Sequence, residues 1–150
     1  MALPPLDASA IRLGSTAAAR TDAVEQTGRV LVEIGAVDEQ YVAAMHEREG
    51  SVSTFIGEGV AIPHGTDPAR VHVKRTALSF LQFPDGVDWA GQEVKVCLGI
   101  ASQGTEHVAV LSALAQILMD PEKAETLRSA STPEQVLELL AGDEDEDEDE

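Results

Sequence analysis

Hydrophobic positions follow two spacings along this chain, one typical of helices and one typical of strands. The three-to-four-residue spacing of amphipathic helices covers 21–34 and 38–50, and a third helix with apolar positions between 108 and 118 follows Gly104 and Thr105. Two further helices are predicted to begin at 121 and 133. Compact apolar runs predict short strands at 10–13, 55–56, 60–62, 71–81 and 94–101. Helices and strands alternate, so we expect an α/β sandwich around a small, largely buried sheet.

The ends of the predicted elements carry capping and turn residues. Asp38 precedes the second helix, and Asp120-Pro121 opens the fourth with proline at its first position. The last helix has Pro133 at its first position and Gln135 at its third, where it can cap the helix start. Gly35 supplies a stop for the first helix. The stretch 83–86, Phe-Pro-Asp-Gly, predicts a turn that ends the fourth strand.

Length and charge indicate one folded domain with charged or proline-rich ends. The 150 residues suit a single core, and we expect an N-terminal extension at 1–8, a domain at 9–142 and a disordered acidic tail at 143–150. The net charge is −17, of which the tail contributes eight charges, so the rest remains acidic at −9. The tail is interpreted as a solvated extension, with attraction to a basic partner as the alternative. Nucleic acid is excluded as a partner because no cluster of Lys and Arg is present.

Composition also indicates the cellular location and excludes several kinds of catalytic and metal site. No apolar run approaches bilayer length, and the N-terminus lacks the pattern of a signal peptide, so we expect no membrane insertion. The lone Cys97 lies in an apolar run and indicates a buried thiol in a reducing compartment, which predicts a cytoplasmic location. The histidines and the cysteine do not have the spacing of a metal site, and the motifs of serine hydrolases, nucleotide hydrolases and dinucleotide binders do not occur. We expect neither a metal nor a cofactor.

The stretch 57–66 sets one histidine between a proline and a glycine. Pro63 fixes its own φ and holds the preceding residue extended, while Gly65 allows the chain to turn at once. We therefore expect a strand end that presents the His64 imidazole at a loop tip beside bare backbone N–H groups. A neutral imidazole is a good nucleophile near neutral pH, and N–H groups suit phosphoryl oxygens. By itself, this stretch fits a surface turn with an incidental histidine equally well.

A second histidine lies beyond the most apolar strand. His107 falls in the first turn of a predicted helix, and sites in α/β sheets form just past the carboxyl ends of strands. A helix N-terminus favours anions and a neutral imidazole, so His107 could orient and stabilise a phosphoryl group on His64. Alone, His107 is better explained as a polar residue at a helix end. His46 and His72 do not lie in predicted turns, and plain surface roles are expected for both.

Two charged residues complete the candidate site. Arg48, at the end of the second helix, could supply a fixed positive charge to a phosphoryl group, although a single arginine is usually just part of the surface. Glu58 could hold His64 or Arg48 in place, and a solvated loop carboxylate is the simpler alternative.

The stretch 53–65, Ser-Thr-Phe-Ile-Gly-Glu-Gly-Val-Ala-Ile-Pro-His-Gly, resembles the phosphorylation-site signature of EIIA domains of the mannitol/fructose class. These type-2 domains belong to the bacterial phosphoenolpyruvate-dependent sugar phosphotransferase system. The resemblance extends from about Ile11 to Gly142, includes the Glu106-His107 pair, and is strongest for the mannitol-specific type. The acidic tail lies outside the family pattern, and the residues just before His107 vary among relatives.

The resemblance implies a three-layer α/β sandwich, with a mixed, mostly parallel sheet of about five strands and helices on both faces. It also implies a phosphocarrier with no metal or organic cofactor. His64 would accept a phosphoryl group from phospho-HPr as a tele-phosphohistidine and pass it to a cysteine of a cognate EIIB during mannitol uptake through EIIC. EIIB and EIIC are expected on separate polypeptides. His107 would match the second active-site histidine of the family, and Arg48 its phosphoryl-stabilising arginine.

Three alternatives remain open from the sequence. The chain could serve fructose or another polyol, or it could be a regulatory, nitrogen-type EIIA that acts as a phosphorylation-switched binding module. A hydrolase that uses His64 is more distant, because no second nucleophile or carboxylate pair accompanies it. For a carrier, we expect partners to dock on an apolar rim of Phe55, Ile56 and Ile62 near His64.

Overall fold

The chain alternates between helices and strands. A computed structural model describes residues 8–51, 53–102 and 106–148. At 67, 106–111 and 141–148 it describes the backbone alone. The strands are β1 (Ile11–Arg12), β2 (Phe55–Gly57), β3 (Val60–Ala61), β4 (Ala77–Trp89) and β5 (Gln92–Ala101). The α-helices are α1 (Arg20–Glu33), α2 (Glu39–Ser51), α3 (Glu106–Leu118), α4 (Pro121–Ser129) and α5 (Pro133–Glu148). Two short 3₁₀ helices are η1 (Ala8–Ala10) and η2 (Asp67–His72).

The strands form one mixed sheet in the order β1-β4-β5-β3-β2. Strand β1 runs parallel to β4, and β3 runs parallel to β5. The pairs β4–β5 and β2–β3 are antiparallel. The mixed sheet of five strands is confirmed. Mostly parallel pairing was expected, but among the described strands two pairs are parallel and two are antiparallel. The reason is a tight hairpin at Ala90 and Gly91, whose positive φ values of 55° and 93° join β4 directly to β5.

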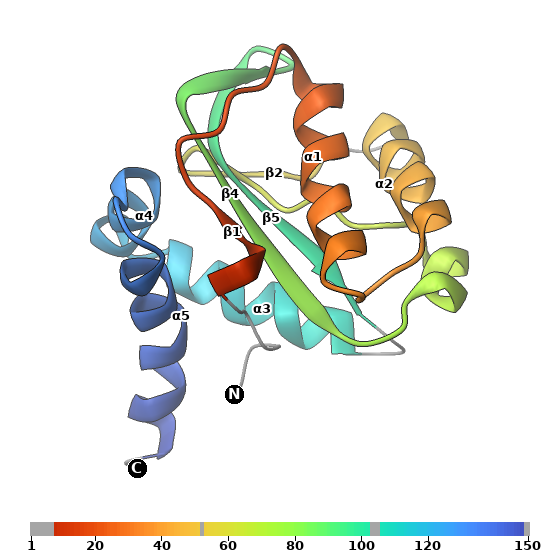
Figure 1. Ribbon diagram of the computed structural model, residues 1–150. Coiled ribbons are helices and arrows are strands. Elements are labelled where there is room, and N and C mark those ends of the chain that lie inside the picture. The colour runs from red at the N-terminus through yellow and green to blue at the C-terminus, as the bar shows by residue number, and fades with distance from the viewer. Residues whose placement is uncertain (1–7, 52, 103–105, 149–150) are drawn as a thin grey trace.

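Helices cover both faces of the sheet, which gives the three predicted layers (Figure 1). Helices α1 and α2 lie on one face, and α3, α4 and α5 lie on the other. Along each inner strand, side chains point to the two faces of the sheet in turn. Leu81 and Cys97 pack in the layer of α1, and Phe80 and Leu98 pack in the opposite layer. The two central strands are therefore buried on both faces, as their nearly continuous apolar sequence predicts.

Cys97 lies within the core below α1. Its residue is fully buried, and burial raises the pKa of its thiol to about 12. A thiol with so high a pKa is rarely ionised and is a poor nucleophile. Cys97 therefore serves as a small apolar residue of the core, which confirms the expected burial.

The helix ends use the caps that the sequence predicts. The Asp38 carboxylate accepts a hydrogen bond from the Gln40 N–H at 3.0 Å, and Asp120 accepts one from Glu122 at 2.9 Å. At the start of α5, Gln135 Oε1 accepts the backbone N–H of Thr132, the residue before the helix, at 3.2 Å. These bonds satisfy donors that a helix N-terminus otherwise leaves without partners.

Two predicted features of the sheet are wrong in detail. The stretch 71–81 is not one strand, because Val71 and His72 belong to η2 and β4 begins at Ala77. The stretch 83–86 does not end the strand but forms a bulge, since the pairing register with β5 shifts between Gln82 and Val87. Gly86, with φ of 83°, permits the bulge, and pairing resumes at Val87. A glycine in this conformation suits a turn and a bulge alike, so the sequence does not distinguish them.

Helix α5 differs from the expectation for the acidic end. Its backbone remains helical to Glu148, past Gly142 and into the run that the sequence predicts to be disordered. Glutamate is a good helix former, and extending an existing helix requires no new nucleus. The domain boundary at 142 remains a prediction.

Candidate active site

His64 lies just past the carboxyl end of β3, beside the carboxyl end of β5. The residue forms a parallel bridge with Ile100, and the Ile100 N–H donates to the Pro63 carbonyl at 3.0 Å. His64 is only 6% exposed, whereas the sequence predicts an imidazole at a loop tip. The difference arises because the backbone keeps its extended pairing to β5 beyond the end of β3. A partner can therefore reach only a small part of the residue.

One backbone hydrogen bond determines the tautomer of His64. Its Nδ1 lies 2.8 Å from the carbonyl oxygen of Ile62. A carbonyl oxygen can only accept, so Nδ1 carries the proton in this contact. A neutral imidazole protonated at Nδ1 has its lone pair on Nε2. The geometry thus makes Nε2 the nucleophilic nitrogen.

Tyr41 of α2 holds the residue that follows His64. The tyrosine hydroxyl donates to the Ile100 carbonyl at 2.8 Å and accepts the Gly65 N–H at 2.9 Å. Burial raises the pKa of Tyr41, so the hydroxyl keeps its proton for this bond. A Cβ atom at Gly65 would lie 2.6 Å from the tyrosine ring, and only glycine fits so close an approach. The sequence analysis did not include Tyr41 in the site, although it is the only tyrosine of the chain.

Arg48 belongs to the last turn of the same helix. It follows Tyr41 by seven residues, which places it on the same helix face and about 10 Å further along the axis. Helix α2 therefore carries Arg48 on the face that contacts the His64 loop. The residue is half-buried.

The carboxyl end of β5 leads to His107. Its backbone is the second residue of α3, while its side chain lies outside the described residues. The topology brings the backbone of His107 and that of His64 to the same edge of the sheet. Ser102 lies at this edge too, 5% exposed, and its hydroxyl has no hydrogen-bond partner within the described part of the chain. A buried hydroxyl without a partner is costly, which marks Ser102 as a residue that the sequence analysis missed.

The structure does not bring Glu58 to His64. Glu58 lies in the turn between β2 and β3, where its carbonyl accepts a hydrogen bond from Arg128 of α4 at 2.6 Å. Its carboxylate also lies 3.6 Å from Arg128. The neighbouring Gly59 pairs with Lys95, five residues before Ile100 on β5 and so roughly 16 Å from the His64 bridge. The expected contact of Glu58 with His64 is therefore corrected, because strand β3 separates the two residues. The alternative contact of Glu58 with Arg48 stays a prediction.

The two remaining histidines form pairs elsewhere. His46 Nε2 lies 2.8 Å from Glu25, and the bonds of His46 and Arg29 lower the pKa of that carboxylate. His72 Nδ1 lies 3.0 Å from Asp38. Both histidines are half-buried, in keeping with the surface roles that the sequence predicts.

The apolar rim expected around His64 is only partly present. Ile56 is 40% exposed and Phe55 is half-buried, but Ile62 is only 7% exposed and packs in the core. Ile62 cannot take part in a docking rim because strand pairing turns its side chain toward the layer of α3 to α5.

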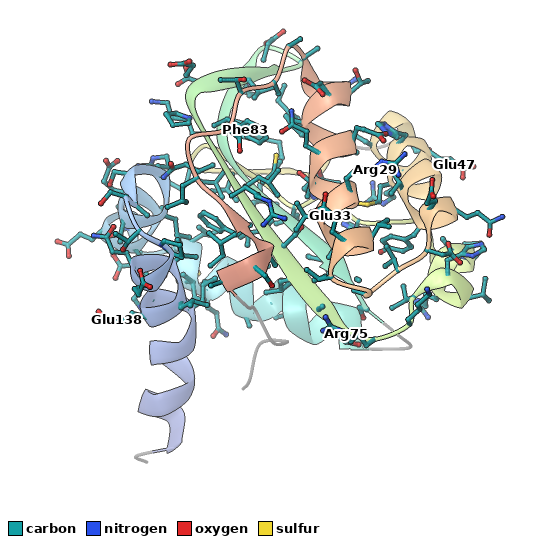
Figure 2. All side chains as sticks on the ribbon, viewed as in Figure 1. Arg29, Glu33, Glu47, Arg75, Phe83 and Glu138 are labelled. Atoms are coloured by element: carbon teal, nitrogen blue, oxygen red, sulfur yellow. The ribbon has the colours of Figure 1, made fainter. Side chains whose placement is uncertain are left out.

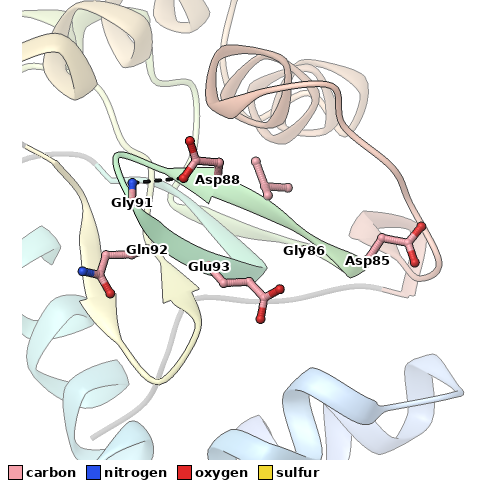
Figure 3. A pocket seen from close by; sticks show the side chains of 7 residues that line it. Asp85, Gly86, Asp88, Gly91, Gln92 and Glu93 are labelled. Atoms are coloured by element: carbon pink, nitrogen blue, oxygen red, sulfur yellow. Dashed lines mark hydrogen bonds between the residues drawn. The ribbon is translucent and has the colours of Figure 1, made fainter.

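An open hollow of about 300 Å³ lies at the opposite end of the β4–β5 hairpin (Figure 3). It is lined mainly by the acidic residues Asp85, Asp88 and Glu93 and by the backbone of the bulge and the turn. Three or more metal-binding side chains do not come together anywhere in the described residues. Among these residues, no helix is both long and apolar enough to cross a bilayer.

Comparisons with known proteins agree with this geometry. Residues 5–142 match the family described as "Phosphoenolpyruvate-dependent sugar phosphotransferase system, EIIA 2". The mannitol-specific phosphotransferase enzyme IIA component of Staphylococcus aureus is 42% identical over 81% of this chain and 84% of its own length. That of Geobacillus stearothermophilus is 39% identical over 93% and 97%.

Solved structures give the same result. The enzyme IIA of Escherichia coli, in a complex with phosphorylated enzyme IIB of the mannitol system, superimposes with a TM-score of 0.88 at 38% identity. That match covers 93% of this chain and 99% of the other. The crystal structure of IIA mannitol from Escherichia coli gives a TM-score of 0.85 over 91% and 99%. This chain therefore belongs to the EIIA 2 family of the phosphoenolpyruvate-dependent sugar phosphotransferase system.

Proposed function

We propose that His64 carries a phosphoryl group in transit between two proteins of the sugar phosphotransferase system. The observation that carries this proposal is the 2.8 Å hydrogen bond from His64 Nδ1 to the Ile62 carbonyl. It supports Nε2 as the phosphoryl acceptor, because the lone pair of the neutral ring then lies on that nitrogen. The tele position implied by the family resemblance agrees with this tautomer.

The transfer exchanges one phosphorus–nitrogen bond for another. His64 Nε2 donates its lone pair to the phosphorus of phosphohistidine on HPr, and the bond from phosphorus to the HPr nitrogen breaks. The HPr imidazole keeps the electron pair of that bond. Through this step, Nδ1 of His64 keeps its proton and its bond to Ile62, so the positive charge of the phosphorylated ring is partly balanced by the carbonyl dipole. A cysteine thiolate of EIIB then attacks the phosphorus, and Nε2 recovers its lone pair.

Three further residues are proposed to support the transfer. Phosphoryl transfer depends mainly on positioning and on donors directed at the phosphoryl oxygens. Arg48, on the face of α2 that contacts the loop, would supply a positive charge, and His107 would supply a hydrogen bond from the start of α3. The buried hydroxyl of Ser102 would donate to a phosphoryl oxygen and so gain the partner that the described residues do not provide.

Mannitol is the substrate branch that we propose. The relatives named above are described as mannitol-specific, and the Escherichia coli enzyme IIA was solved with phosphorylated enzyme IIB of the same system. We accordingly propose phospho-HPr as donor and a mannitol EIIB as acceptor. The buried Cys97 thiol fits a reducing compartment, so the cytoplasm is the proposed location.

A phosphorylation assay tests the carrier function. Incubation with phosphoenolpyruvate, enzyme I and HPr is expected to place an acid-labile, alkali-stable phosphate on the wild-type chain and none on His64→Ala. His46→Ala is a matched control, because it removes a half-buried histidine outside the site. A label that persists in His64→Ala would overturn the assignment.

Reconstitution with EIIB domains tests the substrate branch. We expect the phosphorylated chain to transfer to a mannitol EIIB faster than to a fructose EIIB. Transfer to the fructose protein at the same rate or faster would favour the other branch. A chain that is phosphorylated yet transfers to neither would favour the regulatory, nitrogen-type role.

A further inference from the structure

Glu49, next to Arg48 at the end of α2, is a buried carboxylate outside the proposed phosphoryl contacts. It is 5% exposed. One oxygen accepts the Thr54 hydroxyl at 2.5 Å, and the other accepts the Thr54 N–H at 3.0 Å and Trp89 Nε1 at 2.9 Å. All three donors are neutral groups. Because a carboxylate is expensive to bury, a role beyond packing would account for its presence.

A continuous path of hydrogen bonds leads from Glu49 to the imidazole. The carboxylate holds Thr54 by its N–H and its hydroxyl. The Thr54 carbonyl accepts the Ile62 N–H at 3.0 Å. The Ile62 carbonyl accepts Nδ1 of His64 at 2.8 Å. Each member of the path is therefore held by the one before it, and the last bond sets the tautomer of His64.

The Ile62 carbonyl needs such support because of the residue that follows it. Its peptide group ends in Pro63, which has no N–H and so cannot tie that group to a neighbouring strand. After this peptide group, the Pro63 carbonyl accepts the Ile100 N–H. Before it, the nearest backbone hydrogen bond is the one from the Ile62 N–H to the Thr54 carbonyl. The orientation of the acceptor for Nδ1 thus depends on the position of Thr54.

We propose that Glu49 is a positioning residue for His64, acting through Thr54 and Ile62. By fixing Thr54, the carboxylate keeps the Ile62 carbonyl directed at Nδ1 and so holds the lone pair of the ring on Nε2. The catalytic consequence rests on the phosphocarrier function proposed above, whereas the effect on the tautomer does not.

The variant Glu49→Gln tests the path with almost no change in volume. Its amide NH₂ replaces one accepting oxygen, so at least one of the three donors loses its acceptor. Glu47→Gln is the matched control, because Glu47 is exposed on the same helix and points away from the sheet (Figure 2). Ring ¹⁵N NMR reports which imidazole nitrogen is protonated, and a spectrum of His64→Ala assigns the signal.

We expect His64 in Glu49→Gln to lose its preference for the Nδ1–H tautomer. With phospho-HPr as donor, kcat should fall about tenfold or more, while KM changes less than about twofold, because the acceptor is misaligned and the docking surface is intact. Glu47→Gln should match the wild type in all three measurements. If Glu49→Gln loses stability but keeps the wild-type tautomer and kcat, Glu49 is merely structural and the proposal fails.

A second pair of variants covers the case in which Glu49→Gln does not fold. Thr54→Val removes the hydroxyl that donates to Glu49, whereas Thr54→Ser keeps it. The valine variant is expected to shift the tautomer in the same direction by a smaller amount, and the serine variant to restore it. Equal tautomer populations in both variants would overturn the path.

The two proposals can fail separately. If the wild type takes no phosphate, the carrier function fails, and the NMR result still decides whether Glu49 sets the tautomer. If His64 is phosphorylated and the tautomer ignores Glu49 and Thr54, the carrier function stands and the positioning role fails.

Discussion

The two ends of the β4–β5 hairpin both gather polar groups, but they do so in opposite ways. At the bulged end, Asp85, Asp88 and Glu93 surround an open hollow, and all three residues are exposed. At the other end, the polar atoms of Tyr41 and His64 are buried and each has a defined hydrogen-bond partner. The hollow is lined by exposed carboxylates, whereas the buried end holds its polar groups in fixed directions. Phosphoryl transfer depends mainly on such positioning of groups.

The electrostatics of the two ends differ as well. Three carboxylates repel an anion from the hollow at neutral pH. The edge that carries His64 and Ser102 leads into the N-terminus of α3, where the helix dipole favours negative charge. A phosphoryl group would therefore be disfavoured at the acidic hollow and favoured at the edge that carries His64.

The largest effect is expected when the buried end loses its central hydroxyl. Tyr41→Phe keeps the ring but leaves the Gly65 N–H and the Ile100 carbonyl without the partner they have now. The free energy of unfolding should fall by about 1–3 kcal/mol, and phosphorylation of His64 should slow. Urea unfolding followed by the fluorescence of Trp89, the only tryptophan, measures the first effect. A loss of stability with an unchanged transfer rate would show that Tyr41 supports the fold but not the site.

A smaller and more selective effect is expected at Ser102. Ser102→Ala removes a buried hydroxyl that has no partner within the described residues, so stability should stay the same or rise. Phosphorylation by phospho-HPr should slow severalfold, because one donor to the phosphoryl group is lost. Ser112→Ala, at an exposed position of α3, is the control. Equal rates for the two variants would exclude Ser102 from the phosphoryl site.

The smallest effect is expected at the hollow. The double variant Asp85→Asn, Glu93→Gln removes two of its three carboxylates and should leave the rate of phosphorylation within about twofold of the wild type. The free energy of unfolding should change by no more than about 0.5 kcal/mol, since both residues are exposed. A tenfold change in rate would mean that the hollow takes part in the function after all.

The sequence predicts those features that depend on neighbouring residues. The caps at Asp38, Asp120 and Gln135 are local, and so is the restriction that Pro63 places on the chain before His64. The sheet edge that joins His64 to the start of α3 follows from the order of strands and helices.

Features that join distant residues could not be predicted in this way. The bond of Tyr41 to Gly65 spans 24 residues, and that of Glu49 to Trp89 spans 40. Glu58 shows the reverse case. It is close to His64 in sequence, but strand β3 lies between them and Glu58 contacts Arg128 of α4 instead. The first two pairs are far apart in sequence but in contact in space, whereas Glu58 and His64 are near in sequence but apart in space.

Ile100 belongs to the central strand, yet both of its backbone polar groups serve the His64 loop. Its N–H holds the Pro63 carbonyl, and its carbonyl receives the Tyr41 hydroxyl. His64 is thereby joined to a strand that is buried on both faces of the sheet. Because the loop and the central strand share these hydrogen bonds, a local opening of the loop would also break bonds of the sheet core, which raises the free energy of such an opening.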